Sequence, residues 1–274
     1  MSDEVTKAYK DQEFLNSPDA RTIRMLCEYY EPRRRFYDNK VFNTVVFFGS
    51  ARLVDSDRAR KRLTDARAAV EGGAADLAAQ EELQRAESAM DMSRYYDESR
   101  ELARRFTEWS IRRPKGRRRV IVCTGGGPGI MEAANRGAAD VPGGKSIGLG
   151  ISLPKEERLN PYVSDGLGME FHYFFMRKYW FAYLAKALIV FPGGFGTLDE
   201  LAELTTLRQT KKMTKHVPVV LYGTQYWNKV IDMRAMVEAG TISPGDLDLM
   251  YRCDTVDAAF DYLTGELDIA ESDD

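Results

Sequence analysis

The sequence predicts an α/β protein built on a doubly wound parallel sheet. Short apolar runs alternate along the chain with segments of helical periodicity. These runs lack polar alternation, as in residues 187–191, and such a pattern is typical of parallel strands that helices cover on both faces. Three of the runs lead directly into glycine-containing turns, and the carboxyl ends of strands are where open α/β sheets bind ligands.

The composition argues against several classes of protein. A hydrophobic fraction of 44% and a charged fraction of 30% are ordinary for a soluble globular protein of 274 residues. The net charge of −3 argues against a nucleic-acid partner, and the basic runs at residues 33–35 and 112–119 are expected to be solvated ends of elements. Three widely spaced cysteines and two histidines provide no zinc motif. We expect a cytoplasmic protein without a metal, a signal peptide or a membrane-spanning segment.

The N-terminal region, residues 1–40, is expected to pack on the main domain. Ser17, Pro18 and Asp19 form a helix start, with an N-cap serine and a proline at the first helical position. This helix should end before Pro32, because the residue before a proline disfavours helical geometry. One short helix cannot bury its own apolar stripe, so it needs the main domain as a partner.

The main domain is predicted over residues 41–265, as a single Rossmann-like unit that an acidic tail at 266–274 follows. Its first strand is expected at residues 43–48, and Gly49 and Ser50 follow this strand directly. A glycine and a hydroxyl at the end of a buried strand suit a ligand, and an ordinary tight turn explains them equally well.

Residues 56–92 interrupt the alternation of strands and helices. They are charged and rich in alanine, and apolar residues step by four, three and four on each side of Gly72 and Gly73. We predict two antiparallel helices around a glycine turn, which form an arm inserted before a separate helix at residues 95–109. The seam positions of the arm are Ala59, Leu63, Ala66 and Val70, then Ala79, Leu83, Ala86 and Met90.

A second buried strand, residues 120–123, leads into a turn that contains Gly125, Gly126, Gly127 and Gly129. This turn matches neither the dinucleotide fingerprint nor the P-loop, so the sequence supports neither dinucleotide nor nucleoside-triphosphate binding. Further strands are expected at residues 146–153, 187–191, 217–222 and near 250–253, and further helices at 171–184, 227–239 and 256–263.

The central strand, residues 187–191, is followed by a turn with Gly193, Gly194 and Gly196. Thr197 is a good helix N-cap, so strand, glycine turn and helix start lie in one line. Such a turn aims backbone N–H groups and the positive end of a helix dipole at its occupant, which is usually a phosphate. Glu200 has two interpretations: the last residue of a capping box with Thr197, or a carboxylate held beside the phosphate pocket for chemistry.

The helix at residues 171–184 is dominated by aromatic residues, yet it carries Arg177 and Lys178 side by side. Adjacent helical residues point about 100° apart, so the two side chains cannot share one target in the same way. A buried guanidinium without a partner costs several kcal/mol, so Arg177 must meet an anion. Its partner is either a structural carboxylate, such as Glu170 or Glu200, or a ligand group in the pocket at Gly193.

Three motifs together resemble a known family. They are GGGPGIMEAANRGA at residues 125–138, MRK at 176–178 and PGGFGTLDE at 192–200. The chain resembles the Lonely Guy (LOG) phosphoribohydrolases, a family once mislabelled lysine decarboxylases, and within it the longer members. The resemblance extends from about residue 19 to 263, and the arm at residues 56–92 departs from the family pattern.

The resemblance implies an activity and a site. Members of this family hydrolyse the N-glycosidic bond of purine nucleoside 5′-monophosphates, including AMP and cytokinin nucleotides, to the free base and ribose 5-phosphate. The resemblance implies that Arg177 and Glu200 are the catalytic pair and that no metal or organic cofactor is required. The implied substrate-binding and phosphate-binding residues are Gly49, Ser50, Gly125, Gly126, Gly127, Gly129, Met131, Lys178, Gly193, Gly194, Gly196 and Thr197.

The expected partner is therefore a purine nucleoside 5′-monophosphate, and we expect neither a nucleic acid nor a membrane. The chain is also expected to form a homodimer or a higher homo-oligomer. The alternative function is a non-catalytic nucleotide or cofactor carrier that uses the same pocket, since molybdenum-cofactor carrier proteins share the PGGxGT turn. The presence of both Arg177 and Glu200 favours the enzyme.

Overall fold

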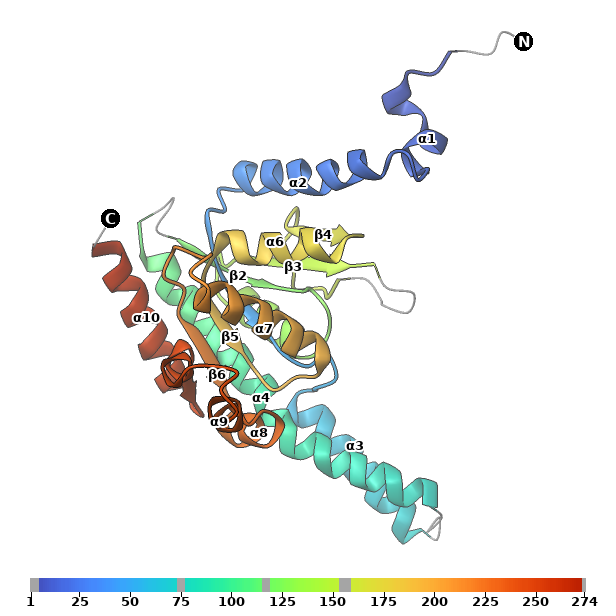
Figure 1. Cartoon of the computed structure of the whole chain (residues 1–274). Helices are drawn as coiled ribbons and strands as arrows, with labels where there is room; N and C mark the ends of the chain where they lie inside the picture. The colour runs from blue at the N-terminus through green and yellow to red at the C-terminus, as the bar shows by residue number, and fades with distance from the viewer. Residues whose placement is uncertain (1–4, 73–76, 115–118, 153–158, 273–274) are drawn as a thin grey trace.

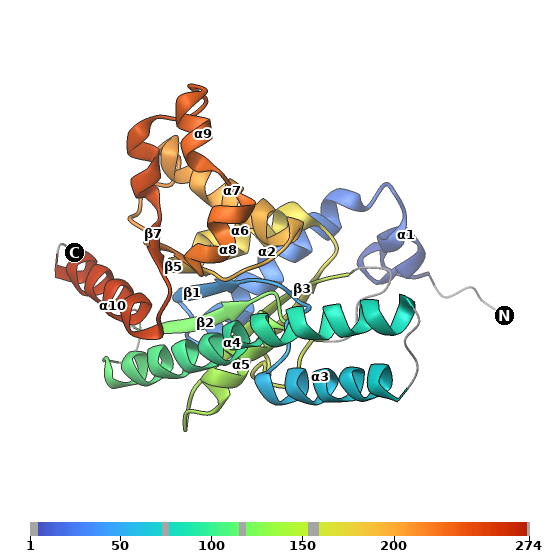
Figure 2. The same ribbon diagram turned by 90° about the horizontal axis from the view of Figure 1, so that it is seen from below.

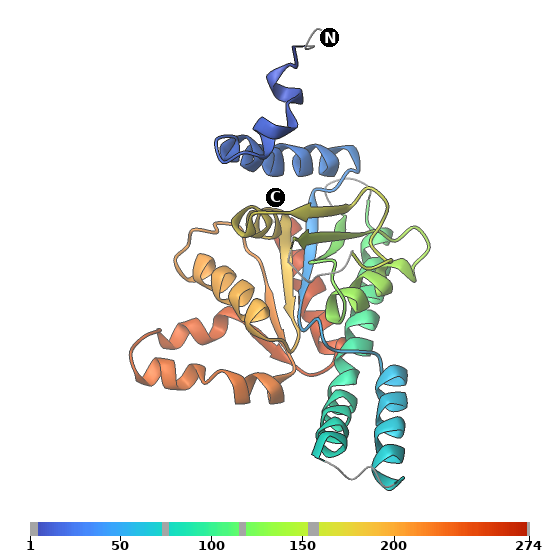
Figure 3. The same ribbon diagram turned by 90° about the vertical axis from the view of Figure 1, so that its right-hand side faces the viewer.

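The computed structural model describes residues 5–72, 77–114, 119–152 and 159–272. It shows a seven-stranded sheet with helices on both faces (Figures 1 and 3). Every strand pair is parallel, and the prediction of a doubly wound α/β fold is confirmed. The strands are β1 (Asn43–Phe48), β2 (Val120–Thr124), β3 (Ser146–Ile151), β4 (Gly168–Phe171), β5 (Ala185–Val190), β6 (Val219–Tyr222) and β7 (Tyr251–Cys253).

The order of the strands, β4-β3-β2-β1-β5-β6-β7, places the point where the winding reverses between β1 and β5. Open α/β sheets bind ligands outside the carboxyl ends of the strands at this point. The helices are α1 (Gln12–Asn16), α2 (Arg21–Asp38), α3 (Ser56–Glu71), α4 (Leu77–Arg112), α5 (Ile130–Ala139), α6 (Phe174–Leu184), α7 (Phe195–Gln209), α8 (Thr224–Val230), α9 (Met233–Glu238) and α10 (Val256–Ser272), with short 3₁₀ turns η1 (Ala8–Lys10) and η2 (Pro244–Leu249).

Two apolar cores lie on opposite faces of the sheet. One contains Val46 and Val190 together with Trp180 of α6 and Leu201 of α7. The other contains Val45 and Ile189 together with residues of α4, α5 and α10. Successive residues of a strand point to opposite faces, so the unbroken apolar runs of β1 and β5 supply both cores at once.

The N-terminal helix α2 differs from its predicted extent, because it begins at Arg21 and continues through Pro32 to Asp38. A proline has no N–H to donate, so the carbonyl of Glu28 loses its helical partner. The indole Nε1–H of Trp180 donates to this carbonyl over 2.9 Å. Packing against α6 therefore satisfies the group that the proline leaves unpaired, and the helix does not have to end.

The arm forms as predicted between α3 and the first part of α4, which lie side by side and antiparallel (Figure 2). Ala59, Ala66 and Ala86 are buried in its seam, and the remaining seam positions are half-buried. The second helix of the arm is not separate from the predicted helix at 95–109, however. It is one helix of 36 residues, and buried residues from Ser93 onward hold its second part on the sheet.

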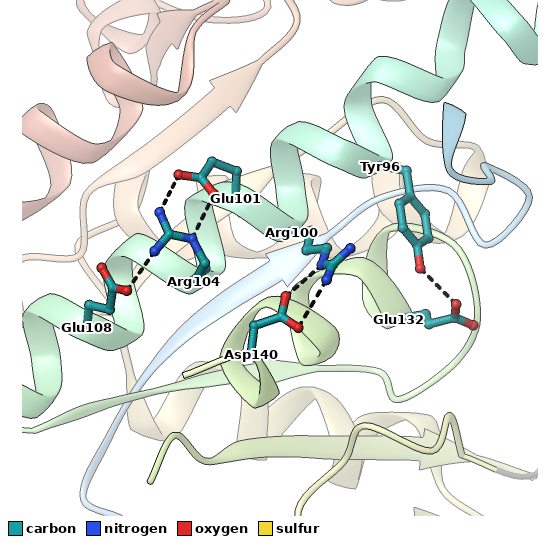
Figure 4. Close-up of polar contacts among 7 residues, drawn as sticks. All are labelled: Tyr96, Arg100, Glu101, Arg104, Glu108, Glu132 and Asp140. Carbon is teal, nitrogen blue, oxygen red and sulfur yellow. Dashed lines mark hydrogen bonds and ion pairs between the residues drawn. The ribbon is translucent and has the colours of Figure 1, made fainter. Parts of the chain in front are cut away.

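Helix α5 packs closely on α4 because Gly137 leaves room for it. A Cβ at this position would lie 2.0 Å from the carbonyl oxygen of Arg100. Polar contacts reinforce the packing: Arg100 pairs with Asp140 at 2.6 Å, and the Tyr96 hydroxyl donates to Glu132 at 2.8 Å (Figure 4). The part of α4 next to the arm is thereby fixed to both ends of α5.

Several other elements differ from the predictions. Strand β4 was not predicted, and α6 begins at Phe174 because Phe171 ends that strand. The predicted helix at 227–239 is two helices, α8 and α9, and the Asp232 carboxylate caps the second by accepting from the Ala235 N–H. Helix α10 extends past residue 263 to Ser272, since Leu267 is buried in the same core as Leu263. The predicted tail at 266–274 thus begins inside a helix.

The described residues contain no helix that is long and apolar enough to cross a bilayer. Nor do they contain a group of three His, Cys, Asp or Glu side chains that could hold a metal ion.

The arm is predicted to lie outside the catalytic domain, and its removal tests that division of the chain. Replacing residues 57–91 by a short Gly/Ser loop should leave the sheet folded, because the seam buries its apolar residues within the arm itself. The shortened protein should unfold in one cooperative transition with a Tm within a few degrees of the parent. Loss of cooperative unfolding would show that the arm belongs to the core.

Candidate active site

The three loops that the sequence singled out meet at the carboxyl ends of β1, β2 and β5. The Ser50 N–H donates to the carbonyl of Pro192 over 2.9 Å, and the Ile130 N–H donates to the carbonyl of Ser50 over 3.0 Å. Gly129 has a φ of 71°, and a Cβ there would lie 2.2 Å from the Ser50 carbonyl oxygen. The close contact of these backbones explains why glycine occupies this position.

The turn after β5 begins its helix earlier than predicted. Helix α7 starts at Phe195 with Gly194 as its N-cap, and the Leu198 N–H donates to the Gly194 carbonyl over 3.0 Å. Thr197 therefore lies inside the first turn, where its hydroxyl faces Gly193. A Cβ on Gly193 would lie 2.1 Å from the Thr197 Oγ1. The interpretation of Glu200 as the capping-box partner of an N-cap Thr197 is wrong.

Glu200 instead faces Arg177 of α6. The guanidinium Nη2 lies 3.3 Å from Oε1 of Glu200, and the side chains are 15% and 6% exposed. The rings of Phe174 and Phe181 lie 5.2 and 5.7 Å from the guanidinium carbon and shield it from water. The other carboxylate proposed as a partner for Arg177, Glu170, accepts from the Ser152 hydroxyl at 2.6 Å.

The environment of Glu200 sets its protonation near neutral pH. Burial raises the pKa of its carboxyl to about 7, against the opposing effect of the positive charges of Arg177 and Lys178. The nearby carboxylates of Glu203 and Asp199 add to the rise. A carboxyl with such a pKa can exchange a proton with water at physiological pH, which suits a general base.

Lys178 points to a different set of partners, as its position next to Arg177 predicts. Its Nζ lies 2.8 Å from Oδ1 of Asp199 and 2.9 Å from Oε2 of Glu203, both on α7. Two carboxylates thus hold an ammonium that the resemblance assigns to substrate binding.

A buried polar network, which the sequence did not predict, supports the triple-glycine loop. The Asn160 amide Nδ2 donates to the carbonyls of Gly126 and Gly127, each over 3.0 Å, and to Oδ1 of Asn135 over 2.9 Å. Oδ1 of Asn135 also accepts from the Thr124 hydroxyl. The Met131 side chain lies against the same loop, with its sulfur 2.8 Å from where a Cβ of Gly125 would be. An asparagine in a helix of small apolar residues was the only signal in the sequence.

The turn at Gly194 to Thr197 is open on its outer side. A Cβ on Gly194 or on Gly196 would meet no atom within 4 Å, and Phe195 between them is 92% exposed. On the inner side, the Tyr226 hydroxyl of α8 donates to the Gly193 carbonyl over 2.8 Å, a contact that the sequence did not predict. Tyr226 therefore holds the turn on its inner side, and the outer side is accessible. A ligand phosphate would approach the first N–H groups of α7 from this outer side.

Comparisons with known proteins agree with the motifs. Residues 131–263 match the family model described as "possible lysine decarboxylase". A pyrimidine/purine nucleotide 5′-monophosphate nucleosidase of Escherichia coli strain K12 is 34% identical over 116 residues, which are 39% of this chain and 25% of that protein. A probable cytokinin riboside 5′-monophosphate phosphoribohydrolase of Oryza sativa subsp. japonica is 29% identical over 150 residues, 52% of this chain and 67% of that protein.

These matches are partial, and the chain spans about a quarter of the length of the E. coli relative. Among solved structures, a molybdenum cofactor binding protein of Rippkaea orientalis shares 15% sequence identity with a TM-score of 0.44, over 81% of this chain and 96% of that one.

The glycine turn offers a matched pair of substitutions. In Gly193→Ala the new Cβ would overlap Thr197 and lie 3.0 Å from the Ser50 backbone N, so the turn must shift. We expect a loss of about 1 to 3 kcal/mol in the free energy of unfolding, as for other overpacked sites. Gly194→Ala adds its Cβ in open space, so chemical denaturation should find a smaller loss, at most about 1 kcal/mol for the poorer N-cap residue. Equal stabilities of the two variants would contradict this geometry.

A second prediction concerns the protonation of Glu200. Because its pKa is raised in the fold, the folded state holds a proton between about pH 4.5 and about pH 7 that the unfolded chain has released. The free energy of unfolding should therefore fall as pH rises through this window. Glu200→Gln removes this pH dependence. The difference in the free energy of unfolding, variant minus parent, should therefore rise by about 1 to 3 kcal/mol between about pH 4.5 and about pH 8. A variant that instead loses stability relative to the parent as pH rises would show that pairing with Arg177 outweighs burial.

Proposed function

Because this chain belongs, by its motifs and by these comparisons, to the Lonely Guy (LOG) family, we propose that it is a nucleoside 5′-monophosphate N-ribosidase. It hydrolyses the bond between base and ribose and releases the free base and ribose 5-phosphate. The observation that carries the proposal is the buried pair of Arg177 and Glu200, because Glu200 lies in α7 directly after the glycine turn at the reversal point of the sheet.

The proposed chemistry follows from the charge of this pair. Departure of the base leaves an oxocarbenium-like ribose, and a carboxylate beside it stabilises the cation and deprotonates water, as in glycoside hydrolysis. Glu200 is the carboxylate in this scheme. Arg177 favours the ionised form of this carboxylate, and in this proposal its guanidinium contacts the ribose phosphate or the departing base. No step in this scheme needs a metal or an organic cofactor.

The phosphate of the substrate is assigned to the turn at Gly193, Gly194, Gly196 and Thr197. The first N–H groups of α7 have no acceptor within the helix, and the positive end of the helix dipole favours an anion there. We assign Gly49, Ser50 and the loop at residues 125–129 to the ribose and the base, since backbone hydrogen bonds join Ser50 to the residues that flank both turns. Purine is the proposed base: the name of the E. coli relative includes purine nucleotides beside pyrimidine ones, and the name of the rice relative includes a cytokinin riboside 5′-monophosphate.

A carrier protein with the same pocket is the alternative, and the buried catalytic pair argues for the enzyme. Binding alone does not need a carboxylate whose pKa lies near neutrality beside the site of an anionic ligand, since it weakens such binding when ionised. We further propose a cytoplasmic protein that binds no nucleic acid. Its three cysteines are free thiols, two of them buried, and its net charge is negative.

The function predicts a strong demand for the 5′-phosphate. A charge-assisted hydrogen bond contributes about 1.5 to 3 kcal/mol, so the loss of several should lower kcat/KM for adenosine at least about a hundredfold relative to AMP. Chromatography of the base released from AMP, GMP, CMP, UMP and adenosine measures both this ratio and the preferred base. Equal turnover of AMP and adenosine would contradict the assignment of a phosphate site. Release of no base from any of the nucleotides would favour the carrier function.

Self-association is the second prediction, and two exposed apolar stripes support it. One lies on α2, with Ile23, Leu26, Tyr30 and Tyr37 between 41% and 73% exposed, and the other on α6, with Phe175 and Tyr183 at 52% and 58%. Adjacent exposed stripes of this kind mark protein interfaces. Tyr30→Lys combined with Tyr183→Lys should shift a homodimer toward monomer in sedimentation velocity, whereas Tyr9→Lys, at an exposed tyrosine of η1, should not. A parent that sediments as a monomer would contradict self-association.

A further inference from the structure

One residue of the N-terminal helix α2 caps the helix that carries Arg177. The half-buried Glu28 carboxylate accepts two backbone hydrogen bonds, from the His172 N–H at 2.7 Å and from the Tyr173 N–H at 3.2 Å. These two residues directly precede α6, and Tyr173 is its N-cap. A carboxylate here satisfies N–H groups that have no acceptor within α6 and matches the positive end of its dipole.

The main-chain carbonyl of Glu28 is also bound to α6, which fixes the position of this residue. Its carbonyl, which Pro32 leaves without a helical partner, accepts from the indole of Trp180 over 2.9 Å. Trp180 is 2% exposed and packs against Phe36 of α2, with ring centroids 5.2 Å apart. Arg35 adds a hydrogen bond of 2.7 Å to the carbonyl of Gly168 in β4. Glu28 therefore contacts α6 twice, at its start through the side chain and in its middle through the main chain.

Arg177 is connected to this cap through the backbone of Tyr173. Its N–H donates to the Tyr173 carbonyl over 3.2 Å, while the N–H of the same Tyr173 donates to Glu28. At the other end of α6, the Lys215 Nζ donates to the carbonyls of Ala182 and Tyr183 over 2.8 and 2.7 Å. Opposite charges thus hold both ends of α6 in the sense that its dipole favours, and the helix is fixed along its axis.

We propose that Glu28 is a positioning residue for the reaction, which holds α6 so that the Arg177 guanidinium meets Glu200. The inference rests on the proposed function of that pair and extends the catalytic machinery to the N-terminal helix, which contributes no group to the pocket itself. A displacement of about 1 Å at a catalytic group lowers a rate by up to about a hundredfold, so a cap one turn away from Arg177 is close enough to matter.

A purely structural role of Glu28 predicts a different outcome. It would lower the stability of the protein and leave the chemistry of each folded molecule unchanged. A positioning role also changes the titration of Glu200, which four neighbouring charges influence: Arg177 and Lys178 favour its ionised form, and Glu203 and Asp199 disfavour it. When Arg177 moves away, the ionised form loses its nearest positive charge, and the acid limb of the pH–rate profile moves to higher pH.

The experiment compares Glu28→Ala and Glu28→Gln with Glu31→Gln in the full chain. Glutamine keeps one acceptor oxygen and alanine keeps none, so the effects should rank alanine above glutamine. Glu31 is an exposed carboxylate of the same helix that pairs with Arg35, and its variant controls for general changes in α2. We expect Glu28→Ala to lower kcat for AMP about ten- to a hundredfold, to change KM less, and to raise the midpoint of the acid limb by about one pH unit.

Amide hydrogen exchange at His172 and Tyr173 reports the cap directly and should be faster in Glu28→Ala than in Glu31→Gln. A folded Glu28→Ala with parental kcat and an unchanged acid limb would overturn the proposal. Should alanine prevent folding, Glu28→Gln decides by the same criteria. Should the parent release no base, the proposed function fails, and the proposal is then judged on the pH dependence of unfolding. Positioning requires Glu28→Gln to move the Glu200 transition to higher pH, and an unchanged transition would overturn it.

Discussion

A buried carboxylate beside a buried guanidinium joins the two helices on which the candidate site depends. Arg177 comes from α6 and Glu200 from α7, and the two side chains meet at 3.3 Å with little exposure to water. Both charges are withdrawn from water, so neither helix can move away without leaving a buried charge uncompensated. The pair therefore fixes where α6 lies relative to α7. The contacts of α2 at the start of α6 and of Thr197 on the glycine turn both help to keep it in place.

The sequence predicted the parts of the fold that depend on local pattern. Apolar runs located β1, β2, β3, β5 and β6, because a strand covered on both faces is apolar along most of its length. Heptad stepping located the seam of the arm, since side chains four and three residues apart share one helix face. The Arg177 to Glu200 contact followed from burial of a charge in an aromatic helix, although Glu170 and a ligand were equally compatible with the sequence.

What the sequence did not predict depends on contacts between distant residues. Pro32 normally ends a helix, but Trp180 satisfies the carbonyl that it leaves unpaired. Thr197 has the chemistry of an N-cap, but close packing on Gly193 draws it into the first turn. Strand β4 is four residues long and begins with a glycine, so its local signal is weak and its pairing with β3 decides its structure. Asn160 supports the triple-glycine loop from a segment with no pattern of its own.

In the proposed reaction Glu200 performs the chemistry, and the turnover of Glu200→Gln tests this role most directly. Glutamine has nearly the same shape and still accepts a hydrogen bond from Arg177, but it carries no negative charge and takes no proton from water. We expect the variant to remain folded, to bind AMP, and to release ribose 5-phosphate about 10² to 10⁴ times more slowly than the parent, the usual scale for a general acid or base. Release at the parental rate by a folded Glu200→Gln protein would contradict the account.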